Sequence, residues 1–141
     1  MELEFDFRKE PSSLFGEINR PVARITLING LNEIPEYVYV DSGADITLIS
    51  KSVGDLLGFS VEKEDTITEI KGIGERGVPI IVKKINMKIG EKIFETRIAW
   101  ALIEEVPLLL GRTDIFNLFS ISFEKNKKTK FNDHENNNTK K

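Results

Sequence analysis

Two long β-type segments joined by a tight turn place the strongest limit on what this chain can fold into. Residues 80–89 and 92–102 are rich in β-branched and aromatic side chains, and Gly90-Glu91 lies between them as a hairpin signal. In the second segment, alternate residues from Phe94 to Leu102 share one face, which is typical of a half-buried strand. The two segments therefore predict a long antiparallel hairpin.

The rest of the chain also favours short strands. Leu3, Phe5 and Phe7 alternate with acidic residues, and five further strands are expected at 22–28, 37–40, 66–71, 108–110 and 119–123. Pro11 and two serines make residues 9–13 an expected linker. Two short helices are expected, at 50–58 with Ser50 as N-cap and at 114–118 with Thr113 as N-cap. About eight short strands with two short helices indicate an all-β barrel or sandwich.

Composition narrows the chemistry. The chain has no Cys, which excludes a disulfide framework, a thiol nucleophile and any zinc site built on cysteine. Its one His, His134, lies in a polar stretch and is expected to be solvated, so a Ser/His/Asp arrangement is not predicted. No metal and no cofactor are expected. A hydrolase of this composition is expected to use carboxylates.

The 141 residues predict one domain with a tail. Residues 124–141 are rich in Lys, Asn and Thr, carry a net charge of +3, and are expected to form a disordered basic tail. The remaining residues, 1–123, carry −6, which is not the charge of a nucleic-acid binder. Contact of the tail with nucleic acid or an anionic membrane is a weaker hypothesis than a solubilising role. No apolar stretch is long enough for a membrane span and no secretory signal is visible, so a soluble cytoplasmic protein is expected.

The tripeptide Asp41-Ser42-Gly43 is the first candidate for chemistry. Alone, it is also a common turn without function. Here it is flanked by the apolar residues 38–40 on one side and by Ala44 and the apolar residues 46–49 on the other. Such flanks predict a carboxylate held at the edge of a core, where burial can change its pKa.

Two further segments stand out. Residues 108–112, Leu-Leu-Leu-Gly-Arg, predict a buried strand that ends at a glycine, where backbone can approach backbone closely. Residues 72–77 match the dinucleotide pattern G-x-G-x-x-G, but a strand-like run containing Pro79 follows where that motif needs a helix. The glycines therefore predict the tip of a mobile hairpin that can cover a site.

In their order along the chain, the three segments resemble the retropepsins, the aspartic proteases of retroviral type and their cellular relatives. Residues 41–44 match the family's D-[ST]-G-A loop, 70–74 match its flap tip, and 106–112 match the apolar Gly-Arg segment behind the loop. The resemblance covers residues 20–123. It leaves 1–19 as an N-terminal extension, and the helix at 50–58 is more similar to the cellular members.

The resemblance implies an all-β closed barrel with a flap hairpin, active as a symmetric homodimer because the chain has a single D-S-G. It implies that Asp41 is catalytic and that Ser42, Gly43 and Ala44 support the catalytic loop. Asp45 and Arg112 would form an ion pair near the substrate, which Arg20 would join across the dimer interface, although a purely structural ion pair is as plausible. The other implied roles are the flap for Gly72, Ile73 and Gly74, support behind the loop for Leu110 and Gly111, and apolar pockets for Ile46, Ile73 and Ile80 or Ile81.

The function implied is that of an aspartic endopeptidase that acts on a polypeptide substrate bound as an extended strand. The alternative is a catalytically inactive dimerisation or peptide-binding module on the same fold, because a fold does not guarantee an activity.

Overall fold

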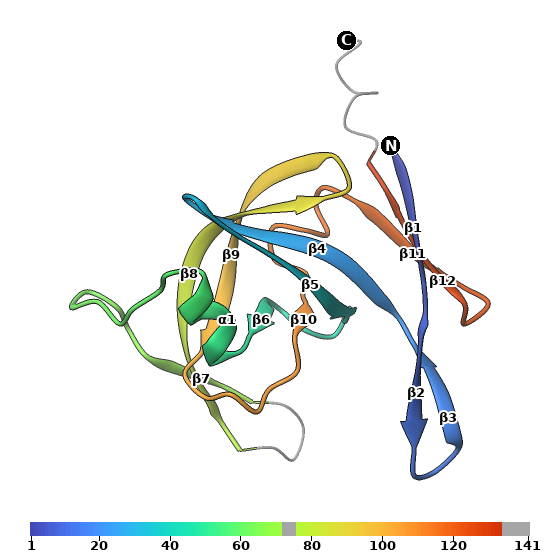
Figure 1. Cartoon of the computed structure of the whole chain (residues 1–141), viewed down its shortest axis with the longest axis horizontal. Helices are drawn as coiled ribbons and strands as arrows, with labels where there is room; N and C mark the ends of the chain where they lie inside the picture. The colour runs from blue at the N-terminus through green and yellow to red at the C-terminus, as the bar shows by residue number, and fades with distance from the viewer. Residues whose placement is uncertain (72–75, 134–141) are drawn as a thin grey trace.

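The computed structural model describes residues 1–71 and 76–133, which form an all-β fold with one short helix (Figure 1). Its elements are β1 (Glu2–Asp6), β2 (Arg8–Ser12), β3 (Gly16–Arg20), β4 (Val22–Asn29), β5 (Asn32–Val40), β6 (Thr47–Ile49), α1 (Lys51–Leu56), β7 (Thr68–Ile70), β8 (Val78–Ile89), β9 (Lys92–Ala101), β10 (Leu109–Leu110), β11 (Ser120–Glu124) and β12 (Lys128–Asn132).

Six strands close into a barrel, which confirms the predicted fold class. They follow the order β4-β5-β10-β6-β9-β8, and β8 pairs back onto β4. The expected long hairpin is β8–β9, paired from Ile80 opposite Ala101 to Ile89 opposite Lys92. β7 pairs antiparallel with the start of β8, and these two strands form the two sides of the expected flap hairpin.

β5 is longer than expected, because it continues through Pro35. Pro35 lies opposite Thr26 on β4. On the other side of β5, β10 pairs only with Tyr39 and Val40. The missing N–H of the proline therefore interrupts no pairing there.

The apolar core of the barrel extends to α1, which packs against it. Ser50 caps this helix by accepting a hydrogen bond from the Val53 N–H, as expected. Val53 and the buried Leu57 join the core, where they lie with Trp100. A smaller apolar cluster, made of Leu48, Ile80, Ala99 and Ala101, lies beside it.

The C-terminal segment corrects the prediction of a disordered tail. β12 lies between β1 and β11 in a three-stranded sheet. Phe131 is fully buried and contacts the rings of Phe5 and Phe119, at 5.8 and 5.6 Å between centroids. The prediction is thus wrong for residues 124–133, because one phenylalanine and pairing on both edges order a polar strand. His134 and the rest of the expected tail lie outside the described residues.

The first twenty residues also contain more structure than expected. The strand predicted from Leu3 to Phe7 is confirmed as β1. The linker expected at 9–13 is wrong, since β2 pairs with β3 in a separate two-stranded hairpin. In Figure 1 this hairpin projects away from the barrel, beyond the end of β5.

The second expected helix is absent from the described residues. Residues 112–119 form successive turns, and Asp114 has a positive φ of 66° that a helix does not allow. The Asp114 carboxylate accepts hydrogen bonds from the backbone N–H and the guanidinium of Arg97, which hold it in this conformation. In the described part of the chain, the helical segment is far too short to cross a membrane.

Candidate active site

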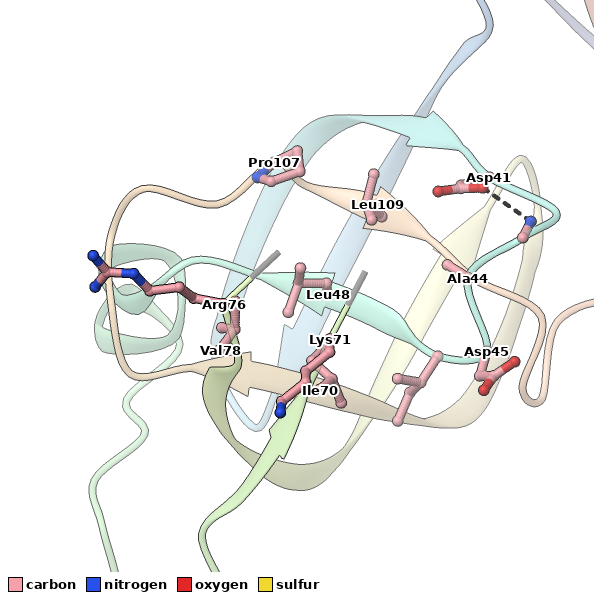
Figure 2. Close-up of a pocket in the computed structure, with 12 residues that line it drawn as sticks. Asp41, Ala44, Asp45, Leu48, Ile70, Lys71, Arg76, Val78, Pro107 and Leu109 are labelled. Atoms are coloured by element: carbon pink, nitrogen blue, oxygen red, sulfur yellow. Dashed lines mark hydrogen bonds between the residues drawn. The ribbon is translucent and has the colours of Figure 1, made fainter. Parts of the chain in front are cut away.

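Asp41 is held at the end of β5 by backbone and side-chain hydrogen bonds. Its N–H donates to the Leu110 carbonyl at 3.0 Å, and its own carbonyl accepts the Ala44 N–H at 3.1 Å. One carboxylate oxygen, Oδ1, accepts the Gly43 N–H at 2.9 Å (Figure 2). The side chain is half-buried, so the turn presents a fixed carboxylate at the edge of the core.

The segment behind this turn depends on a glycine. A Cβ added at Gly111 would lie 2.4 Å from the carbonyl carbon of Ile46 and 2.5 Å from its oxygen. The Gly111 N–H donates to the hydroxyl of the buried Thr47 at 3.1 Å. Leu110 is fully buried beside it. Gly111 and Leu110 therefore lie directly behind the Asp41 turn.

Arg112 joins this support to the rest of the turn. Its N–H donates to the Ala44 carbonyl at 3.0 Å, and its Nη1 donates to the Ser42 carbonyl at 2.7 Å. Its Nη2 donates to Asp45 Oδ1, which gives the ion pair. The Asp45 side chain is 86% exposed. One guanidinium thus bridges both ends of the turn and leaves most of the Asp45 carboxylate open to solvent.

An open cleft of about 430 Å³ begins at this turn. Figure 2 shows Asp41 and Asp45 at one end and Lys71 and Arg76 farther along. The lining is mainly apolar and comprises Asp41, Gly43, Ala44, Asp45, Ile46, Leu48, Ile70, Lys71, Arg76, Val78, Pro107 and Leu109. The cleft thus joins the turn, the flap hairpin and the end of the barrel.

The cleft differs in part from what the sequence predicts. Ile46 lies in its wall. Ile80 and Ile81 are buried in the core and line no part of it, so their expected place in the pocket walls is wrong. Val78, two residues before Ile80 on the same face of β8, lines the wall instead, and Ile80 is buried in the apolar cluster against which Val78 packs. The predicted flap-tip residues Gly72, Ile73 and Gly74 lie outside the described residues.

A polar cluster that the sequence did not predict lies beside Asp41. The Tyr39 hydroxyl donates to Glu10 Oε2 at 2.7 Å, and its ring lies 5.3 Å from the guanidinium carbons of both Arg8 and Arg20. Glu10 also pairs with Arg8 at 3.0 Å and with Arg20 at 3.1 Å. Arg20, Tyr39 and Asp41 line a second hollow together with Pro107. A carboxylate in β2 therefore fixes the hairpin next to the candidate catalytic turn.

The charges of the cluster favour the ionised form of Glu10. The hydrogen bond from Tyr39 holds the pKa of Glu10 below its ordinary value, and the two arginines act in the same direction. Glu10 is therefore ionised at neutral pH. The one sequence signal for this contact was the position of Tyr39, two residues before Asp41 on the same strand.

Within the part of the chain that the structure describes, Asp41 is the carboxylate in the cleft that has no cationic partner, since Asp45 is paired with Arg112. Residues 1–71 and 76–133 contain no cluster of three His, Asp or Glu side chains that would hold a metal ion. The chemistry available at this site is that of a positioned carboxylate in an apolar cleft.

Comparison with known proteins relates this geometry to a fold family. No protein-family model and no curated protein matches the chain. Among solved structures, the EIAV protease in complex with the inhibitor HBY-793 is 26% identical, with a TM-score of 0.54 over 70% of this chain and 86% of that chain. A retropepsin-like aspartic protease from Rickettsia conorii is 16% identical, with a TM-score of 0.61 over 93% of this chain and 91% of that chain. The chain therefore has the fold of the retropepsin-like aspartic proteases.

Proposed function

We propose that this chain is an aspartic endopeptidase, active as a symmetric homodimer in which each subunit supplies Asp41. The observation that supports this most is the fixed Asp41 carboxylate at the end of an apolar cleft in a retropepsin-like fold. One chain supplies one such carboxylate, and a two-fold axis next to Asp41 would supply the second.

Two Asp41 carboxylates within hydrogen-bond distance would share one proton, because like charges that close cannot both persist. The ionised carboxylate would remove a proton from a water molecule as that water attacks the peptide carbonyl carbon. The protonated carboxylate would donate to the carbonyl oxygen. As the C–N bond of the tetrahedral species breaks, the carboxylate that took the water proton would give it to the amine nitrogen, and the other carboxylate would take back the proton that it gave to the carbonyl oxygen. The pair would titrate with two apparent pKa values that belong to both subunits together.

The remaining site residues have positioning roles in this proposal. Gly43 fixes one Asp41 oxygen through its N–H, so the other oxygen faces the reacting water. The exposed Ser42 would hydrogen-bond across the dimer. The exposed carboxylate edge of Asp45 would contact substrate backbone, while Arg112 holds it in place. Main-chain pairing along the cleft would bind the substrate as an extended strand, and the apolar lining would accept its side chains.

The test is a paired cleavage assay. Wild type and Asp41→Asn would be incubated with a complex peptide library from about pH 3 to 8, the range in which paired carboxylates titrate. Mass spectrometry would identify the products. The Asn variant keeps the size of the side chain and the acceptor for the Gly43 N–H but cannot exchange the proton. Cuts made by wild type should disappear in the variant.

Asp55→Asn is the matched control. Asp55 is an exposed aspartate on α1 that pairs with Lys51, away from the cleft. This control should cleave as wild type does. Cleavage by Asp41→Asn at the wild-type rate would contradict the proposal. Dimeric wild type that cleaves no peptide at any pH would favour the inactive binding module.

A further inference from the structure

The β2–β3 hairpin ends in two apolar side chains that contact little of their own chain. Leu14 and Phe15 at its tip are 78% and 73% exposed. The tip is nonetheless ordered, because the Ser12 hydroxyl accepts the N–H of Leu14 at 3.2 Å and of Phe15 at 3.1 Å. Gly16 completes the turn with a φ of 78°. Two adjacent apolar side chains are thus presented on a backbone turn that hydrogen bonds hold in place.

The base of the same hairpin is fastened in two places. On one side, Glu10 binds the Tyr39 hydroxyl and Arg20, next to the Asp41 turn. On the other, the Asn19 amide donates to the Asn126 carbonyl at 3.2 Å, in the turn between β11 and β12. These contacts fix the direction of the hairpin, so little conformational entropy would be lost if its tip bound a surface.

We propose that the β2–β3 hairpin packs on a second copy of this chain, with Leu14 and Phe15 as its anchors. The inference rests on the proposed function, in which two Asp41 turns meet at a two-fold axis. The hairpin base lines the hollow that contains Asp41, so it lies beside that axis. Its strands extend about 14 Å from Arg8 to Ser12, away from the barrel of their own chain (Figure 1).

The proposed dimer also needs more surface than the catalytic turn offers. A stable interface buries about 800 Å² on each partner, and Ser42 and Gly43 are small. The backbone N–H and C=O groups on both edges of β12 already pair with β1 and β11 of the same chain, so β12 cannot add a strand to a partner's sheet. The hairpin adjoins the Asp41 hollow at its base and carries its two exposed apolar side chains at its tip, and two-fold symmetry would bring two such tips into the interface.

Sedimentation equilibrium of the double variant Leu14→Ser/Phe15→Ser tests this proposal. Both side chains are exposed, so the unfolding transition of the variant should match wild type at a protein concentration at which both are monomeric. The dimer dissociation constant should rise by at least about 30-fold, as expected for loss of interface hot spots. Leu31→Ser is the matched control, because Leu31 is an exposed apolar residue at the β4–β5 turn, and it should dimerise as wild type does.

The activity of the double variant separates this inference from the proposed function. Its cleavage per subunit should be low at low protein concentration and return to the wild-type level at high concentration. Unchanged dimerisation would overturn the hairpin contact while leaving the aspartic protease intact. A raised KM with unchanged dimerisation would instead assign the tip to substrate binding. A wild type that is monomeric and inactive at every concentration would overturn both.

Discussion

Replacing Gly111 with alanine should damage both stability and activity, because the chain passes too close to itself there. The added Cβ would lie 2.4 Å from the Ile46 carbonyl carbon and 2.8 Å from its nitrogen. Carbon atoms in contact are normally about 3.5–4.0 Å apart, so one segment must move by about 1 Å. Both contacts are with backbone, and no change of rotamer can relieve them.

The cost of such overpacking is about 1–3 kcal/mol. For a chain of this size, that lowers Tm by roughly 3–5 °C for each kcal/mol. The move would also shift the Leu110 carbonyl, which accepts the Asp41 N–H. A displacement of about 1 Å at a catalytic group can reduce activity by about 100-fold.

Urea unfolding and peptide cleavage measure the two effects separately. Gly43→Ala is the control for stability, because its added Cβ would lie 3.3 Å from Asp41 Oδ1 in an exposed turn. It should unfold within about 0.5 kcal/mol of wild type. If Gly111→Ala unfolded at the same urea concentration as wild type, the close approach to Ile46 would be refuted.

Three further predictions follow from the contacts described above. Phe131→Ala should lower the free energy of unfolding by about 3–5 kcal/mol in urea titrations, because this ring is fully buried; an unchanged midpoint would mean that the C-terminal strand does not pack. Arg112→Leu removes donors to Ser42 and Asp45, so cleavage should fall by at least about tenfold in steady-state kinetics, while an unchanged rate would assign the ion pair to structure alone. Tyr39, Arg8 and Arg20 hold the pKa of Glu10 below its ordinary value. The contribution of Glu10 to the free energy of unfolding should therefore be complete at pH values above the ordinary pKa and should disappear as pH falls through the lowered pKa. The difference in unfolding free energy between wild type and Glu10→Gln should therefore shrink on acidification, and a difference that stays constant would contradict the cluster.

Most of the barrel was predictable because five of its six strands carry local signals, whereas the three-residue strand β6 was not predicted. The long hairpin around Gly90 follows from residue type and turn chemistry alone. The fixed turn at Asp41 follows from apolar residues on both sides of a polar tripeptide. At both places, residues close in the sequence are enough to determine the local structure.

The features that were missed depend on contacts between distant residues. β12 has a polar sequence, and its order comes from pairing with β1 at the other end of the chain. The hairpin at residues 8–20 was hidden because Pro11 suggested a linker, although a two-stranded sheet tolerates proline where its N–H would face solvent. The Glu10–Tyr39 contact joins residues 29 positions apart, and no local pattern reports it.

The pairing of β1 with β12 also sets the order in which a newly made chain can fold. Asp6 meets Lys128 across 122 positions, so at about 5–20 residues per second roughly 6 to 25 s of synthesis separate the two strands. During that time, β1 lacks the strand with which it pairs. β1 must therefore wait for β12 before it can take its place in the three-stranded sheet, although it is synthesised much earlier.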